Sequence, residues 1–262
     1  MISSFKKESR AILSVFNFRL LFILVETVLI FFLYKNYKIN FNIDFTIMSI
    51  AIVFPLVFSI TSAYQRRQDA INLFLEFRNK KIDLTNIFYA VQGIKEKDYN
   101  ELFTLLEQVQ SLLIKYLVFE NDEKIFDQIR SQRKQVLYLI DSHKKLFNER
   151  EKDSLIRIKN ELFLSAEKVR GIKIHGTPIS LKKYCLIFIY FSPFLYNSQS
   201  FVSASSSNIE NFMPLFFVLV VSFVLMALYN IQDYIENPFD QKGLDDFKID
   251  NLKVGKIEGL FN

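Results

Sequence analysis

The stretch FTIMSIAIVFPLVFSITSAYQ, residues 45–65, contains no charged side chain over 21 residues. At about 1.5 Å per residue, a helix of this length crosses the hydrocarbon core of a bilayer, which is about 30 Å thick. Two further uncharged stretches occur, of 26 residues at 184–209 and of 22 residues at 211–232. The sequence therefore predicts an integral membrane protein with several helices that span the bilayer.

A fourth, shorter apolar stretch covers residues 20–34 and carries Glu26 near its middle. It reaches spanning length when it extends to Arg19 and Lys35, whose long side chains can reach the polar interface. A carboxylate in such a helix faces the helix bundle or water rather than lipid. Glu26 is therefore predicted either to hydrogen-bond a neighbouring helix or to take part in ion passage.

The basic residues predict the orientation of these helices, because Lys and Arg concentrate on the cytoplasmic side of a membrane. Residues 64–183 hold 23 of the 33 Lys and Arg side chains. We therefore expect a multi-pass protein of the cell membrane with both termini in the cytoplasm. The predicted order is a cytosolic segment at 1–19, a first transmembrane hairpin at 20–65, a cytosolic helical domain at 66–183, a second transmembrane hairpin at 184–232 and a cytosolic segment at 233–262.

The charged middle of the chain is predicted to be helical. In YNELFTLLEQVQSLLIKYLVF, residues 99–119, apolar side chains recur at helical spacing, and Asp98 with Glu101 fits a capping box at the helix start. A second, longer helix is predicted from Asp122 to about Arg170. No stretch alternates with the two-residue period of a strand. The predicted fold class is all-α, with four transmembrane helices in two hairpins and a helical cytosolic domain.

The composition argues against most catalytic and metal-dependent classes. The chain has only 2 His, 1 Cys and 6 Gly among 262 residues, too few for a Cys/His metal cluster, a disulfide framework or several Gly-rich phosphate loops. His143 is predicted to be solvated surface and Cys185 a small packing residue. No nucleophile stands in a pattern with a base, so we predict no enzyme, no cofactor and no metal site. Nucleic acid is not expected among the partners.

Residues 45–65 contain a second pattern besides their lack of charge. Ile50, Phe54 and Phe58 recur at i, i+4 and i+8 and therefore lie along one stripe of a helix. Pro55, in the same helix, removes a backbone hydrogen bond and favours a kink. Such a stripe either faces lipid or another helix, or forms a hydrophobic constriction when several copies surround an axis. The spacing alone leaves both interpretations open.

Charged residues flank the predicted spans. Asp44 and Glu210 lie near the outer ends of the second and fourth helices. In a symmetric oligomer each would form a ring of carboxylates that raises the local concentration of cations. Lys35 and Lys38 lie in the same outer layer and oppose that charge. The flanking charges therefore do not predict the sign of a permeant ion.

Three motifs, in order along the chain, resemble the bestrophin family of ion channels. FSITSAYQRRQDA, residues 58–70, is similar to the family's aromatic residue followed by a small polar stretch and Ala-Tyr-Asp-Arg-Trp. TPIS, residues 177–180, is similar to the Thr-Pro-Ile-Pro of bacterial members, and ENPF, residues 236–239, resembles the family's Glu-Asn-Pro-Phe-Gly. The order, the spacing and the two-hairpin topology agree over nearly the whole chain. The matched residues are Tyr64, Arg66, Thr177, Pro178, Glu236, Asn237, Pro238 and Phe239.

The resemblance implies a homopentamer in which the second transmembrane helix of each subunit lines a narrow hydrophobic neck. Counting back from Arg66 places the family's three neck residues at Phe58, Phe54 and Ile50, which form the stripe already found by spacing. Counting back from the Thr-Pro motif places a second apolar constriction at Leu155. The implied partners are further copies of this chain, inorganic ions and the lipid bilayer.

The resemblance leaves the permeant ion open. Animal members conduct chloride, whereas at least some bacterial members favour monovalent cations. An anion channel is the preferred interpretation, because anion conduction is the activity that the family shares. The alternatives are a monovalent-cation-selective homologue and a non-conducting membrane scaffold or sensor. The chain also departs from the family pattern at Gln65, where members have Asp, and at Arg67 and Gln68, where members have Trp.

The resemblance also yields a prediction about calcium, because animal members bind Ca²⁺ with an acidic clasp that follows the ENPF segment. Here Lys242 stands where the clasp needs a carboxylate, and a cation beside the site opposes Ca²⁺ binding. Asp245 and Asp246 remain, but two acids alone make a weak site. We predict that micromolar Ca²⁺ leaves the current through the purified protein in a planar bilayer unchanged. A current that grows with Ca²⁺ would contradict this.

Overall fold

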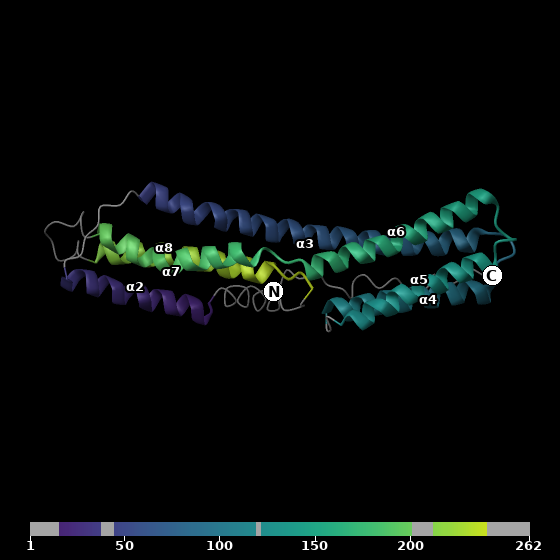
Figure 1. The fold of residues 1–262 in the computed structure, drawn as a ribbon, viewed down its shortest axis with the longest axis horizontal. Coiled ribbons are helices and arrows are strands. Elements are labelled where there is room, and N and C mark those ends of the chain that lie inside the picture. Colours follow the sequence, from purple (N-terminus) through teal and green to yellow (C-terminus); the bar gives the residue numbers. More distant parts are fainter. Residues whose placement is uncertain (1–15, 38–44, 119–121, 201–211, 240–262) are drawn as a thin grey trace, which may run out of the picture. The chain divides into compact units, whose positions relative to one another are not determined.

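The structure is a computed structural model, and it describes residues 16–37, 45–118, 122–200 and 212–239. Every regular element within these ranges is an α-helix, which confirms the predicted all-α class. The helices are α2 (Phe18–Tyr37), α3 (Phe45–Ala90), α4 (Glu96–Val118), α5 (Glu123–Ser142), α6 (Glu149–Ile174), α7 (Ile179–Ser200) and α8 (Met213–Ile235) (Figure 1).

The described chain divides into two compact units. Unit 1 comprises the described residues up to Arg66 and those from Gly176 to Asn237, and unit 2 comprises residues 67–175 with Pro238 and Phe239. Helix α3 runs for 46 residues and contributes to both units. Unit 2 overlaps most of the segment predicted to be the cytosolic domain, whereas residues 176–183 belong to unit 1.

Unit 1 is a helix bundle in which α2, α7 and α8 pack against one another, as the side-by-side ribbons in Figure 1 show. The first part of α3 adds Ile52 and Leu56 to the same apolar core. Cys185 is 1% exposed in this core, so its predicted packing role is confirmed. The buried members of the core are Leu20, Ile23, Ile52, Leu56, Cys185, Ile189, Leu225, Met226 and Tyr229.

Two prolines lie inside helices of unit 1, and each removes a backbone N–H that a helical hydrogen bond would use. Pro55 leaves the carbonyl of Ala51 without its helical donor, and the Tyr184 hydroxyl of α7 donates to that carbonyl over 3.3 Å. Pro193 frees the carbonyl four residues before it, which accepts from the Ser192 hydroxyl over 2.7 Å. Both carbonyls thus regain a donor, as an apolar environment requires.

Unit 2 buries an apolar core formed by α4, α5, α6 and the part of α3 that follows Arg66. The periodic leucines predicted for α4 lie on its buried face. Gly93 turns the chain between α3 and α4 at a φ of 90°, a conformation that glycine adopts without the steric cost of a Cβ. Phe239 is 1% exposed and packs in this core.

The prediction of one helix from Asp122 to about Arg170 is wrong, because the chain breaks there into α5 and α6. The side chain of Asn148 accepts from the N–H of Glu151, and the Glu151 carboxylate accepts from the N–H of Asn148. This capping box starts α6 and fixes the break. The sequence pattern did not predict this break, because the helical periodicity of the apolar residues continues on both sides of it.

The capping box predicted at Asp98 is also wrong, because α4 begins at Glu96 and Asp98 lies inside its first turn. The Asp98 carboxylate lies 3.2 Å from Nε2 of His143, the residue that ends α5. The His143 ring also packs edge-on against Phe88. His143 is therefore a partly buried contact between α5 and its neighbours, and its predicted role as solvated surface is incorrect.

Helix α8 is long and apolar enough to cross a bilayer, and among the described residues it alone meets both criteria. One such helix does not establish the four-span topology, which stays a prediction.

The side chain of Lys81 in α3 is buried in the core of unit 2, so its interactions can be tested through the stability of that unit. The Lys81 ammonium donates to the carboxylate of Glu107 and, over 2.7 Å, to Oε1 of Gln110. Burial lowers the pKa of Lys81, and the hydrogen bond to Glu107 offsets part of that effect.

We predict that Glu107→Gln destabilises the protein by about 1–3 kcal/mol, because it leaves a buried ammonium without its counter-charge. The measurement is the melting temperature of the purified protein by circular dichroism. Lys80→Met, which removes the more exposed Lys80–Glu161 pair, is the control and should cost no more than about 1 kcal/mol. Equal losses in the two variants would show that burial does not set the strength of the Lys81 pair.

Candidate functional site

The stripe predicted from spacing lies on the exposed face of α3 in unit 1. Ile50, Phe54 and Phe58 are 50%, 55% and 62% exposed. The rings of Phe54 and Phe58 are neighbours, with centroids 6.1 Å apart. These large apolar side chains are thus presented outward by a single copy of the chain, over two turns of helix.

The opposite face of α3 explains why the stripe points outward. Ile52, Leu56, Ser59 and Ala63 are all at most 1% exposed and face the bundle. Because their spacing of three and four residues keeps them on one side of the helix, the residues between them must lie on the other. The helical period therefore sets the direction of the stripe once the bundle has covered one face.

Contacts with α7 hold this part of α3 in register. The hydroxyls of Ser49 and Tyr196 lie 3.1 Å apart, and Tyr184 donates to the carbonyl freed by Pro55. Val53 and Val57 widen this apolar surface. Further along α3, the exposed side chains of Thr61, Ser62 and Gln65 are polar but uncharged. The exposed face of α3 from residue 50 to residue 65 therefore contains no ionisable side chain other than the exposed phenol of Tyr64.

A charged cluster lies at the other end of unit 1, where α3 continues into unit 2, α7 begins and α8 ends. The Glu236 carboxylate, just after α8, accepts from the backbone N–H of Thr177 over 3.2 Å and from the Lys182 ammonium. The same carboxylate lies 4.0 Å from Nη1 of Arg66. Asp233, one turn earlier, accepts from Lys182 over 2.7 Å. We call these residues the Glu236 cluster.

Electrostatics bind the Glu236 cluster together. Burial lowers the pKa of the Arg66 guanidinium, and the neighbouring Glu236 carboxylate offsets part of that effect. Burial also opposes the charge of Lys182, but its hydrogen bonds to Asp233 and Glu236 outweigh this and raise its pKa. Asp233 has a lowered pKa because hydrogen bonds from Lys182 and Arg19 outweigh its desolvation. Lys182 and Asp233 therefore stabilise each other in their charged forms.

The structure brings together residues from all three of the sequence motifs. Arg66, Thr177 and Glu236 meet in the Glu236 cluster, and Pro178 supplies the carbonyl that accepts the first helical bonds of α7, from Leu181 and Lys182. Phe239 lies instead in the core of unit 2, Tyr64 is exposed on α3, and Asn237 and Pro238 form the link that follows Glu236.

Several predicted residues take no part in either feature. Leu155, counted as a second constriction, is fully buried in the core of unit 2, and because a constriction residue must face the ion path, we assign it a packing role. Oε2 of Glu26 is buried and has no hydrogen-bond partner among the described residues. Asp44 and Glu210 lie outside the described residues.

Sequence reasoning missed Lys182, Asp233 and Tyr184. The first two resemble any basic or acidic residue at the end of a transmembrane helix, and only their pairing shows their role. Tyr184 could have been found as a hydroxyl able to satisfy the carbonyl freed by Pro55, but its position beside α3 depends on the tertiary structure. No group of three or more potential metal ligands occurs in the parts of the chain that the structure describes.

No family model matches the sequence, and no curated protein matches it. Solved structures match the fold. A bacterial bestrophin homologue from Klebsiella pneumoniae superimposes with a TM-score of 0.74 at 14% identity, over 90% of this chain and 93% of that chain. The fold is that of the bacterial bestrophin homologues. A point variant of the same homologue gives a TM-score of 0.75, and a crystal structure of a membrane protein gives 0.73, both at 14% identity and with the same coverage. At this identity the likeness is one of fold, and the fold implied by the sequence motifs is confirmed.

The Glu236 cluster of this bestrophin-like fold generates a testable prediction. Glu236→Gln keeps the size of the side chain but removes the charge that faces Arg66 and Lys182. We expect a loss of about 1–3 kcal/mol, because two cations then share a partly buried site with less compensation. Cys185, the only cysteine, is 1% exposed in the same unit, so its labelling by a maleimide during heating reports the unfolding of unit 1.

Asp233→Asn is the matched control for this measurement. Its carboxylate is more exposed than that of Glu236, so its loss should cost about 0.2–1 kcal/mol. If Glu236→Gln left the melting of unit 1 unchanged while Asp233→Asn lowered it, the assignment of Glu236 as the centre of the cluster would be wrong.

Proposed function

We propose that this chain is the subunit of a bestrophin-like homopentameric ion channel in the cell membrane, with both termini in the cytoplasm. Four transmembrane helices in two hairpins hold each subunit in the bilayer. Monovalent ions pass along a central axis lined by α3, with anions such as chloride favoured. The partners are other copies of the chain, inorganic ions and lipid.

One observation carries this proposal: the exposed apolar stripe of Ile50, Phe54 and Phe58 on the face of α3 that points away from the bundle. Exposed apolar patches of this kind mark an interaction with lipid or with another copy. The sequence motifs and the bestrophin fold favour the arrangement in which five copies turn this stripe toward a common axis. There it forms a hydrophobic neck.

A neck of this kind controls ions through their hydration. Apolar side chains offer no oxygen or nitrogen to replace the water around an ion, so a narrow ring of them tends to lose its own water and hinders conduction. Weakly hydrated anions lose water more readily, and they can approach the positive edges of the Phe rings. The lack of a formal charge from Ile50 to Gln65 leaves the neck itself without a fixed preference for either sign.

Current across a planar bilayer that contains the purified protein tests the proposal. Under a salt gradient, a reversal potential near the chloride equilibrium value supports an anion channel. The opposite sign supports the alternative, a monovalent-cation-selective homologue, and the carboxylates of Asp44 and Glu210 would then be the first residues to neutralise. A channel of either sign supports a pore, and the sign decides selectivity.

We predict that replacing Phe54 and Phe58 by Ala raises the current, because smaller side chains widen the neck and keep it hydrated. A barrier lowered by about 1.4 kcal/mol raises the current about tenfold. Leu29→Ala is the control, since Leu29 is 60% exposed on α2 and lies outside the proposed neck. An unchanged current in the Phe54 and Phe58 variants, with ions still passing, would place the neck elsewhere.

Subunit stoichiometry separates the channel from a non-conducting scaffold or sensor. Native mass spectrometry of the protein in detergent should show five copies. A monomer or dimer without current would contradict the channel and favour the scaffold, which would use the long helices of unit 2 to bind a partner.

A further inference from the structure

Helix α3 continues beyond the proposed neck, and the chemistry of its exposed face changes there. The helix is continuous and has no proline after residue 55. Asp69 follows Phe58 by eleven residues, which is about three helical turns. Glu76 and Asp83 then follow at intervals of seven residues, about two turns each. The helical period therefore places these three carboxylates on the face of α3 that carries Phe58.

These three acids, which we call the acidic stripe, are open to solvent. Asp69 and Asp83 are exposed, and Glu76 is partly exposed. No hydrogen bond or ion pair joins any of their carboxylates to another residue in the part of the chain that the structure describes. The exposed positions between them are the asparagines Asn72 and Asn79, which add no charge. The exposed face of α3 thus changes from apolar at the stripe of the proposed neck to acidic beyond it.

The cations of the same part of α3 do not neutralise the acidic stripe. Lys80 lies closest to it by helical register, but the Lys80 ammonium binds the carboxylate of Glu161 on α6 over 2.6 Å. Lys81 is buried in the core of unit 2. The basic residues of α3 after Gln65 are all buried or partly buried: Arg66, Arg67, Arg78, Lys80 and Lys81. The exposed face of this part of α3 therefore carries a net negative charge.

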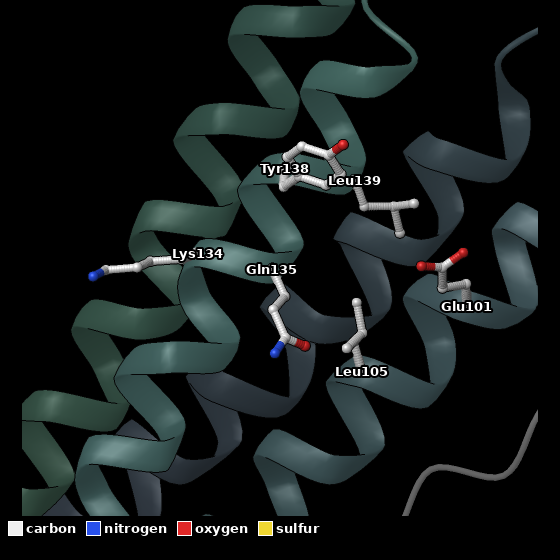
Figure 2. Close-up of a pocket in the computed structure, with 6 residues that line it drawn as sticks. All are labelled: Glu101, Leu105, Lys134, Gln135, Tyr138 and Leu139. Atoms are coloured by element: carbon white, nitrogen blue, oxygen red, sulfur yellow. The ribbon is translucent and has the colours of Figure 1, made fainter.

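Acids on the other helices of unit 2 provide a comparison. Asp127 and Glu167 each form an ion pair with Arg130. Glu101 of α4 forms no ion pair with a described residue, but it lines a hollow of about 520 Å³ between α4 and α5 that Lys134 also lines (Figure 2). This hollow thus has a charge of each sign at its wall. Glu101 therefore serves as a control for exposed negative charge outside α3.

We propose that the acidic stripe is a determinant of ion preference, which concentrates cations and excludes chloride on the cytosolic side of the neck. This inference rests on the proposed pentamer, in which the face of α3 that carries Phe58 lines the ion path. Each acid of the stripe then forms a ring of five carboxylates, and such rings attract cations. Consecutive rings are about 10.5 Å apart along the helix, so no ion contacts two of them at once. The stripe therefore acts through its electric field and not as a coordination site.

The acidic stripe and the neck act differently on the two ions. The neck has no formal charge and discriminates by hydration, whereas carboxylates along a confined passage raise the local concentration of cations about tenfold or more. Chloride that leaves the cytosol must cross this negative region before it reaches the neck. The stripe therefore opposes the anion preference of the proposed neck, and the permeability ratio of the channel reflects both.

The test is the reversal potential of the purified protein in a planar bilayer under a sodium chloride gradient. The stripe variant combines Asp69→Asn, Glu76→Gln and Asp83→Asn. It should raise the permeability ratio of chloride to sodium about tenfold, with current still present. The difference from the wild type should shrink between about 0.1 M and about 1 M salt, because the Debye length falls from about 10 Å to about 3 Å.

The control variant removes three exposed acids from other helices of unit 2, by Glu96→Gln, Glu101→Gln and Asp153→Asn. It changes the net charge equally and should leave the permeability ratio at the wild-type value. Equal shifts in the two variants would overturn the proposal, and so would an unchanged ratio in the stripe variant. A wild-type protein that carries no current would instead contradict the proposed function, and the role of the stripe in ion preference would be refuted with it.

A cysteine on the stripe gives a second readout, which needs no current. Asn79→Cys introduces a thiol between Glu76 and Asp83, and the native Cys185 is only 1% exposed, so it is protected from reagents. The measurement is the rate of modification by a cationic methanethiosulfonate reagent divided by the rate with an anionic one, which cancels the intrinsic reactivity of the thiol. This quotient should be about tenfold higher with the acids present than in the stripe variant. Equal quotients in the two backgrounds would overturn the proposal.

Discussion

The carboxylate of Glu236 joins the start of α7 and the end of α8 to the middle of α3. It accepts the backbone N–H of Thr177 at the start of α7, it binds Lys182 one turn further along, and it faces Arg66 where α3 leaves unit 1. A charge in such a position is stable only when these donors surround it, and each donor is partly buried and needs the charge in return. The direction of α3 relative to the rest of its bundle therefore depends on this contact together with the apolar core and the hydrogen bonds to α7.

Once α3 is held in this way, its two faces have different roles. The face with Leu56 and Ala63 closes the core of unit 1, and the face with Phe54 and Phe58 remains exposed. Pro55 lies between these two aromatic residues, and the carbonyl that it frees is satisfied by Tyr184 from α7. The helix can therefore carry a proline in the middle of its exposed stripe without leaving a polar group unpaired. A hydrophobic neck requires a helix that packs against its own subunit on one face and exposes an uncharged apolar surface on the other.

Unit 2 shows how the same fold treats buried charge in two ways. Lys81 is compensated within the chain by Glu107 and Gln110, so its contribution is structural. Lys159 is equally buried but has Arg133 as its charged neighbour. The first lysine links α3 to α4. Both would look alike in the sequence, as basic residues within an amphipathic helix.

The sequence by itself determined the all-α class, the apolar face of α4 and the stripe on α3, because each depends only on the helical period and on the lack of charge. It also contained the motifs whose residues meet around Glu236. It did not reveal the break before Asn148, because the periodicity of the apolar residues continues across it and only the capping hydrogen bonds mark it. Leu155 was misplaced for a related reason, since counting residues from a motif gives a distance along the chain but not the side of the helix that the core covers.

Only the tertiary structure decided which charges are paired and that the Tyr184 hydroxyl satisfies the carbonyl freed by Pro55. These properties depend on side chains brought together from positions far apart in the sequence, and a linear pattern does not contain the distances between them.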